Sequence, residues 1–224
     1  MSHPHDPGSH SPLAHGAQSP AAALFDEVGA TYETVFADMP AQLAALDWLI
    51  AELAPGSKVL DIGSGTGRPA AEKLAEAGHR VTGIDVSATM VELARARVPG
   101  ATFEQTDVRD LVDDDGAWDA VCAFFSFLQL PRADLDAQLE RLGARLAPGG
   151  LLAFATVPAE ADGVEIDWLG HRFRVTSHGA DELLMRLRAA GLEIVHHAVT
   201  VYHPKHPTAG PEEQLVVHAR KSAS

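Results

Sequence analysis

The sequence predicts one α/β domain, built on a doubly wound sheet of seven strands that is mostly parallel and ends in an antiparallel hairpin. Three observations lead to this prediction. Short β-rich runs alternate with amphipathic helical patterns through most of the 224 residues, which is typical of a parallel sheet covered by helices on both sides. A glycine-rich turn follows the first of these runs. The last two runs have only a loop with proline and glycine between them, so we expect them to pair antiparallel.

The segment before the first strand is expected to be a tail followed by two helices. Residues 1–20 are rich in Pro, His, Ser and Gly and have too little apolar content to offset the entropy of ordering, which predicts a disordered tail. Apolar residues from Leu24 to Leu53 follow helical spacing, and Pro40 divides them into two helices. We therefore expect an N-terminal helical cap at about residues 21–54 of a domain that covers residues 21–224.

The pattern after this cap predicts the remaining elements. In one helical pattern four leucines share a face, and Pro148 followed by two glycines ends it. A small hairpin or lid is expected at residues 164–177. The expected strands lie near residues 58–62, 80–85, 101–104, 118–124, 150–157, 192–200 and 213–220, and the expected helices lie near 68–78, 87–97, 132–147 and 179–190.

Composition restricts the location and the partners. No apolar run approaches the roughly 18 to 20 residues that cross a bilayer, and the N-terminus lacks the pattern of a secretory leader, so no membrane is expected. The single cysteine, Cys122, rules out an internal disulfide, and a cytoplasmic enzyme is the simplest interpretation. A net charge of −14 repels nucleic acids. His203 and His206 have no acidic neighbour in the sequence, so no metal is expected.

The first strand opens into a turn with the spacing Gly-x-Gly-x-Gly, formed by Gly63, Gly65 and Gly67. Glycines allow the backbone to approach a ligand closely where a helix begins. The dinucleotide-binding pattern would need a further glycine where Arg68 stands. Together with the C-terminal hairpin, this disfavours a nicotinamide oxidoreductase.

Acidic residues stand at the ends of three successive strands. Asp61 precedes the glycine turn, Asp85 ends the second strand, and Asp107 follows the third. The carboxyl ends of parallel strands share one edge of the sheet, where ligands bind in such folds. Asp85 could accept hydrogen bonds from ribose hydroxyls and Asp107 from an exocyclic amine of adenine, although Asp107 is also a common type of turn residue.

With these motifs the chain resembles the class I S-adenosylmethionine-dependent methyltransferases, a Rossmann-like family, over roughly residues 24–220. The resemblance implies S-adenosylmethionine as cofactor, with the glycine turn at its methionine part, Asp85 at the ribose and Asp107 at the adenine. Residues 118–125 match the strand whose end faces the transferable methyl group. The resemblance assigns to the cofactor Asp61, Gly63, Ser64, Gly65, Gly67, Asp85, Val86, Met90, Asp107, Val108, Ala123 and Phe124.

The acceptor is expected to be a small molecule with an oxygen, nitrogen or carbon nucleophile, in bacterial secondary metabolism. A protein of this fold that binds the cofactor but catalyses another reaction, or acts as a binding partner, is the alternative. Methyl transfer needs an in-line arrangement, a dry pocket and, for some nucleophiles, a base. The candidate catalytic residues are Tyr32, His171 and His178, and the candidate substrate-pocket residues are Phe125, Gln129 and Trp168. Tyr32 can equally be a core or surface tyrosine, and an exposed loop residue is the favoured interpretation of each histidine taken alone. Some of the pocket candidates are expected to belong to the core instead. The sequence does not indicate the oligomeric state.

Overall fold

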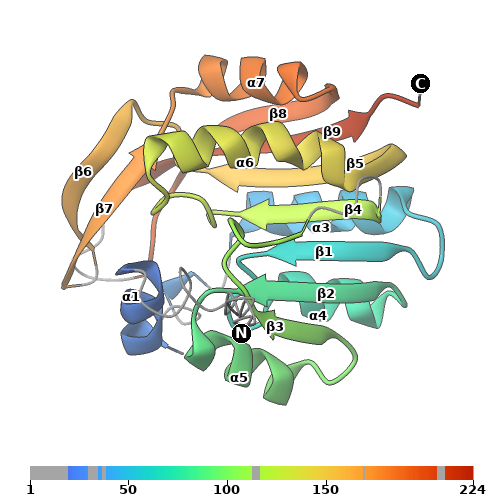
Figure 1. Cartoon of the computed structure of the whole chain (residues 1–224), viewed down its shortest axis with the longest axis horizontal. Coiled ribbons are helices and arrows are strands. Elements are labelled where there is room, and N and C mark those ends of the chain that lie inside the picture. The colour runs from blue at the N-terminus through green and yellow to red at the C-terminus, as the bar shows by residue number, and fades with distance from the viewer. Residues whose placement is uncertain are drawn as a thin grey trace, which may run out of the picture.

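The computed structural model describes residues 20–29, 35–36, 39–112, 117–168, 170–205 and 210–223. They form a seven-stranded sheet with helices on both faces (Figure 1). This is the doubly wound arrangement that the alternating sequence pattern predicts. None of the described helices is both long and apolar enough to cross a lipid bilayer.

The sheet has the strand order β3-β2-β1-β4-β5-β9-β8. Strands β1 to β5 pair in parallel, whereas β9 runs antiparallel to both of its neighbours. The predicted antiparallel C-terminal hairpin is therefore confirmed. The strands span Lys58–Ile62 (β1), Arg80–Asp85 (β2), Thr102–Gln105 (β3), Trp118–Phe124 (β4), Leu146–Thr156 (β5), Leu192–Tyr202 (β8) and Glu212–Lys221 (β9).

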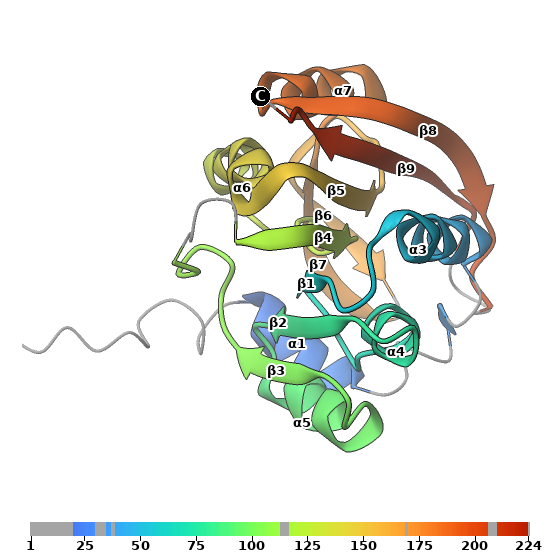
Figure 2. The same ribbon diagram turned by 90° about the vertical axis from the view of Figure 1, so that its right-hand side faces the viewer.

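Helices cover the sheet in two layers. Apolar residues of α3, α4 and α5 pack on one face, and those of α6 and α7 pack on the other (Figure 2). Each layer buries the apolar stripe that its helices show in the sequence. The helices span Pro20–Val28 (α1), Pro40–Glu52 (α3), Ala70–Glu76 (α4), Ala88–Arg97 (α5), Arg132–Arg145 (α6) and Ala180–Ala189 (α7).

Helix α6 differs from its predicted bounds at its C-terminal end. Its leucines line the core as expected, but the helix ends at Arg145 rather than near residue 147. The next residue, Leu146, already pairs with Trp118 of β4. Strand β5 consequently begins at Leu146 instead of near residue 150, because pairing with β4 takes the chain out of the helix before Pro148 is reached.

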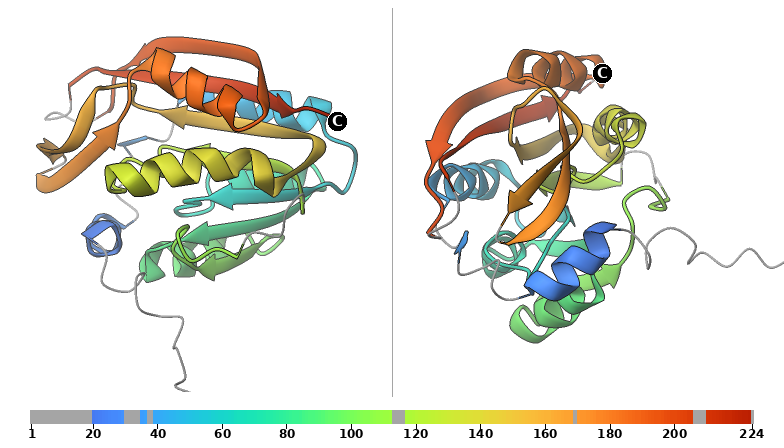
Figure 3. Two further views of the ribbon diagram at one scale, coloured as in Figure 1. Left: turned by 45° about the horizontal axis from the view of Figure 1, so that its top comes forward. Right: turned by 90° about the vertical axis from the view of Figure 1, so that its left-hand side faces the viewer.

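A second, two-stranded sheet stands at the carboxyl edge of the main sheet. It consists of β6 (Ala161–Trp168) and β7 (His171–Ser177), which pair antiparallel and correspond to the predicted small hairpin. Helix α1 lies at the same edge (Figure 3). Of the predicted N-terminal tail, residues 1–19 lie outside the described residues, and Pro20 is the first residue of α1.

Candidate active site

Two cavities open at the carboxyl edge of the sheet. The large cavity, of about 940 Å³, is bordered by the ends of β2 and β4, by α1 and by the β6–β7 hairpin. The small cavity, of about 220 Å³, is bordered by Asp61, Ser64 and Gln42. The two cavities therefore meet between the glycine turn and the end of β4. The residues that border both are Phe36, Met39, Gly63, Gly65 and Phe124.

The glycine turn is held against the end of β2. The backbone amides of Gly63 and Ser64 both donate to the carbonyl oxygen of Ile84, at 2.8 and 2.9 Å. Gly63 has a φ of +69°, and a Cβ atom at this position would lie 2.3 Å from the Cβ of Ser126. No side chain fits there, since both the backbone conformation and the close approach of the neighbouring loop require glycine.

Asp85 is a nearly buried carboxylate whose orientation is fixed by the backbone. Its Oδ2 accepts a hydrogen bond from the Gly65 amide at 2.9 Å, and its Oδ1 accepts one from the Ser87 amide at 2.9 Å. Burial raises the pKa of Asp85, and these hydrogen bonds offset part of that effect. Asp85 therefore presents an oriented acceptor to the large cavity.

Asp61 is buried without full hydrogen-bonding compensation. Its Oδ2 has no hydrogen-bond partner among the described residues, and neither has the hydroxyl of the neighbouring Ser64. Burial, together with the negative charge of Asp85, raises the pKa of Asp61 to about 7. An unpaired buried carboxylate is costly. A cationic group in the small cavity would remove that cost.

Asp107 is paired with an arginine. Its Oδ2 accepts from Nη2 of Arg109 at 2.7 Å, and its Oδ1 accepts from Nε at 3.0 Å. Arg109 also donates to Asp134 at 3.1 Å. The two carboxylates raise the pKa of the Arg109 guanidinium above its usual value. Asp107 is thus held in one orientation at the border of the large cavity.

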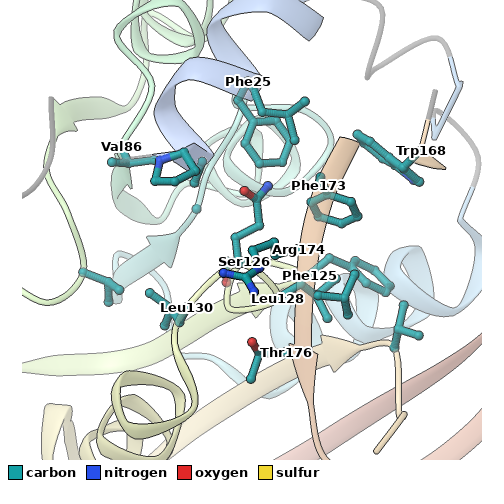
Figure 4. A pocket seen from close by; sticks show the side chains of 18 of the residues that line it. Phe25, Val86, Phe125, Ser126, Leu128, Leu130, Trp168, Phe173, Arg174 and Thr176 are labelled. Atoms are coloured by element: carbon teal, nitrogen blue, oxygen red, sulfur yellow. The ribbon is translucent and has the colours of Figure 1, made fainter. Parts of the chain in front are cut away.

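Aromatic rings wall the part of the large cavity that faces α1 and the hairpin. The Trp168 ring stacks on Phe36 with centroids 5.6 Å apart and meets Phe173 at 5.4 Å and Phe25 edge-on at 6.5 Å. Figure 4 shows Phe25 of α1 beside Trp168 and Phe173 of the hairpin. Phe125 borders it with a φ of 57°, a conformation that is strained for a non-glycine residue.

Helix α1 is fixed to the first turn of α5. Oδ1 of Asp26 accepts hydrogen bonds from the Ser87 hydroxyl at 2.5 Å and from the Thr89 amide at 3.1 Å. Ser87 is also the N-cap of α5 and accepts from the Met90 amide. The helix that closes the large cavity is thereby attached beside Asp85.

A family model described as a methyltransferase domain matches residues 59–150, which contain the glycine turn, all three acidic residues and the end of β4. The N1-methyltransferase for 1,6-didemethyltoxoflavin from Burkholderia thailandensis, solved with its substrate and S-adenosylhomocysteine, is similar over the full length. It is 26% identical with a TM-score of 0.66, over 99% of this chain and 100% of that chain. The chain belongs to the class I S-adenosylmethionine-dependent methyltransferases.

Two other proteins similar to this chain have names that state different reactions, one a methyl transfer and the other a cyclisation. A 27-O-demethylrifamycin SV methyltransferase from Amycolatopsis mediterranei is 34% identical over 75% of this chain and 64% of its own length. The [4+2]-cyclase SpnF is 25% identical with a TM-score of 0.63, over 82% of this chain and 81% of that chain. The chain spans only 40% and 58% of two other curated methyltransferases.

Most residues that the resemblance assigned to the cofactor border one of the two cavities. Two do not. Ala123 is fully buried inside β4, and a Cβ at Gly67 would meet Val98 and Phe103 at 3.0 and 3.1 Å, so Gly67 permits packing between elements. Gly63, Gly65, Asp85, Val86, Met90, Asp107, Val108 and Phe124 border the large cavity, and Asp61 and Ser64 border the small cavity.

The candidate catalytic histidines border neither cavity. His178 is buried between Arg132, whose Nη1 lies 2.6 Å from Nδ1, and Asp136, whose Oδ1 lies 2.6 Å from Nε2. His171 lies 3.5 Å from the Glu27 carboxylate. Tyr32 lies outside the described residues. Neither histidine is therefore among the residues that border the two cavities, although Arg132, the neighbour of His178, borders the large one.

The candidate substrate-pocket residues Phe125, Gln129 and Trp168 all border the large cavity. The Nε2 of Gln129 is buried and has no partner among the described residues, so it can donate to a ligand. Sequence reasoning missed Arg109 and Glu212, which also border this cavity. Among the described residues, no group of three or more metal-ligating side chains comes together.

Proposed function

We propose that this protein binds S-adenosylmethionine across the two cavities and transfers the cofactor's methyl group to a small molecule. One observation carries the proposal. The small cavity is about half polar in its lining and contains an unpaired buried carboxylate, whereas the large cavity combines oriented carboxylates with apolar walls. The cofactor has the same division, because an amino acid with a charged ammonium group is joined to a largely apolar nucleoside base through sulfur and ribose.

The residues present fit the nucleoside part of the cofactor. Asp85 can accept from the ribose hydroxyls, while the side chains of Met90 and Val108 offer apolar contact to the adenine ring. Asp107, which Arg109 holds at the border of the large cavity, can accept from the adenine amine because a carboxylate offers about four acceptor sites on its two oxygens.

The methionine part fits the small cavity. The ammonium group would pair with Asp61, whose Oδ2 lacks a partner, and the Ser64 hydroxyl can bond the polar end of the amino acid. The sulfur joins the two parts and would therefore lie where the cavities meet, beside Met39 and Phe124. The bound cofactor supplies an electrophilic methyl group at this point.

The remainder of the large cavity is proposed to hold the acceptor. Its aromatic walls at Phe25, Trp168 and Phe173 favour a ring system and exclude water from the reacting atoms. The toxoflavin-precursor and rifamycin relatives support a small-molecule acceptor and a role in bacterial secondary metabolism. The cytoplasmic location expected from the sequence stays a prediction.

Calorimetry with S-adenosylhomocysteine tests the cofactor site. The wild type should bind, and Asp85→Asn should weaken binding by about tenfold or more, since a hydrogen bond to a charged group contributes ~1.5–3 kcal/mol. Asp110→Asn, at an exposed position near the same edge, is the matched control and should bind as the wild type does. Absence of binding by the wild type, or equal binding by Asp85→Asn, would contradict the proposal.

The similarity to a cyclase favours a second candidate, in which the same site promotes a reaction other than methylation. The two candidates differ in the mass of the product. An acceptor panel incubated with S-adenosylmethionine and followed by mass spectrometry should yield products heavier by one methyl group. A product of unchanged mass, formed with S-adenosylhomocysteine as readily as with S-adenosylmethionine, would favour the second candidate.

A further inference from the structure

Glu212 is a carboxyl group on the acceptor side of the large cavity. It begins β9, which runs antiparallel to β5 with Leu215 paired to Thr156, the last residue of β5. Glu212 therefore extends past the carboxyl end of β5, at the same edge as the glycine turn. Its side chain borders the large cavity.

A neighbouring glutamine orients this carboxylate. Nε2 of Gln214 donates to Oε1 of Glu212 at 2.7 Å and also contacts the sulfur of Met39 at 3.7 Å. No described residue hydrogen-bonds to Oε2 of Glu212, which leaves that oxygen available to a ligand. Burial raises the pKa of Glu212, and the Gln214 bond offsets part of the increase.

The location of Glu212 relative to the reaction rests on the proposed function. Met39 borders both cavities and so lies where the sulfur and its methyl group are proposed to be. Through Gln214, the Glu212 carboxylate is attached to that same residue. An acceptor in the large cavity would approach the methyl group from this side, opposite the small cavity.

The other carboxylates that border the large cavity are placed differently. Asp85 and Asp107 stand at the strand ends assigned to the ribose and adenine, and Asp162 is an exposed residue of the hairpin. His171 and His178 do not border the cavity. Among the described residues that border the large cavity, Glu212 is thus the carboxylate placed to take a proton from the molecule that receives the methyl group.

We propose that Glu212 contacts the nucleophilic atom of the acceptor and takes up its proton. A lone pair of the acceptor oxygen or nitrogen forms the bond to the methyl carbon as the carbon–sulfur bond breaks, and the electrons of that bond stay on sulfur, giving a neutral thioether. The O–H or N–H proton passes to the Glu212 carboxylate and then to solvent. The acceptor class is accordingly a hydroxyl or amine borne on an aromatic or otherwise apolar ring system.

Sinefungin tests the position of Glu212 without a known acceptor, because this cofactor analogue carries an amine in place of the sulfonium methyl. In calorimetry, Glu212→Gln should bind S-adenosylhomocysteine within about twofold of wild type but lose about tenfold or more in sinefungin affinity, as expected when a charged hydrogen bond is removed. The matched control Glu213→Gln changes an exposed residue on the opposite face of the same strand and should alter neither affinity.

Two outcomes would overturn the proposal. Unchanged sinefungin affinity in Glu212→Gln, with normal S-adenosylhomocysteine binding, would remove Glu212 from the methyl position and leave the proposed function intact. Absence of S-adenosylhomocysteine binding by the wild type would instead reject the proposed function. If Glu212→Gln does not fold, Glu212→Asp retracts the carboxylate by one methylene and should show a smaller loss confined to sinefungin.

Turnover tests the proton transfer itself. With a phenol or aromatic amine that the wild type methylates, Glu212→Gln should lower kcat about 100-fold or more, in the range typical of lost general base catalysis. Glu213→Gln should retain the wild-type kcat. Wild-type turnover by Glu212→Gln would overturn the assignment of the base.

Discussion

Asp61 and Asp85 lie near the ends of the adjacent strands β1 and β2, and the charge of Asp85 adds to burial in raising the pKa of Asp61 to about 7. Asp85 is compensated by two backbone amides, whereas Oδ2 of Asp61 has no partner among the described residues. Two carboxyl groups are therefore buried close together, and only Asp85 has hydrogen bonds that compensate the burial of both of its oxygens. Both the stability of the ligand-free protein and its affinity for a cationic ligand should reflect this.

Asp61→Asn should change how the stability of the ligand-free protein depends on pH. The pKa of Asp61 is higher in the folded state than in the unfolded state, where it is near 3.8, so the folded state holds the extra proton between about pH 4 and 7. Wild-type stability should fall with rising pH in this window, relative to Asp61→Asn, by up to about 1.4 kcal/mol per pH unit.

Thermal and urea unfolding from pH 4 to 8 would measure this difference. The contribution of Asp85, whose pKa burial also raises, is present in both proteins and largely cancels. Asp110→Asn serves as the control and should follow the wild-type curve. Parallel pH curves for wild type and Asp61→Asn would show that Asp61 titrates normally.

The same carboxylate should link ligand binding to proton release. The ammonium group of S-adenosylhomocysteine stabilises ionised Asp61, so binding below pH 7 should expel a proton. The affinity of the wild type should rise with pH up to about 7 and then level off, while Asp61→Asn should bind more weakly and with little pH dependence. Calorimetry in two buffers of different ionisation enthalpy would count the released protons; none released at pH 6 would contradict the pairing.

Gly63→Ala should destabilise the fold through contact with the loop after β4. The added Cβ would lie 2.3 Å from the Cβ of Ser126, and the φ of +69° adds a backbone cost of about 1–2 kcal/mol. Overpacking of a rigid site adds about 1–3 kcal/mol. Gly56→Ala is the matched control, because Gly56 has a similar φ of +75° but open space around its Cβ.

Unfolding in urea should separate the two effects. Gly56→Ala should lose only the backbone cost, and Gly63→Ala should lose more and also bind S-adenosylhomocysteine poorly. The double variant Gly63→Ala/Ser126→Gly removes the clashing atom and should recover part of the lost stability. Equal losses for the two single variants would mean that the loop after β4 moves aside freely.

The sheet could be predicted from the sequence because its strands and helices carry local periodic signals. The start of β5 was wrong because Pro148 and its glycines mark the end of a helix locally, while the pairing of Leu146 with Trp118 depends on a distant strand. Gly67 belongs to the glycine motif but borders neither cavity. It packs against Val98 and Phe103, which are distant in the sequence, so the motif alone could not predict this packing role.

The acceptor side of the site carried the weakest sequence signal. Phe25, Phe36 and Phe173 come from three separated segments, and no spacing rule brings them together around Trp168. In the sequence, Glu212 resembles an ordinary surface acid next to a predicted strand. Only the antiparallel register of β9 against β5 brings it to the edge where the cavities meet.

His178→Ala should lower stability and leave the cofactor site intact. His178 bridges Asp136 and Arg132, and Arg132 also donates to the carbonyl oxygen of Ala161 at the start of the hairpin. Removing the ring leaves two half-buried charged partners without this contact, at a cost of about 1–3 kcal/mol. His171→Ala, at a partly exposed position, is the comparison and should cost little.

Unfolding in urea, calorimetry with S-adenosylhomocysteine and turnover together distinguish a structural from a catalytic histidine. For His178→Ala we expect a lower unfolding midpoint, an affinity within about twofold of wild type and a residual kcat that follows the folded fraction. A variant that keeps wild-type stability but loses methyl transfer would restore His178 as a candidate base and argue against Glu212. Because His178 borders neither cavity and is held between Arg132 and Asp136, while Glu212 borders the larger cavity, we expect the loss of activity only at Glu212.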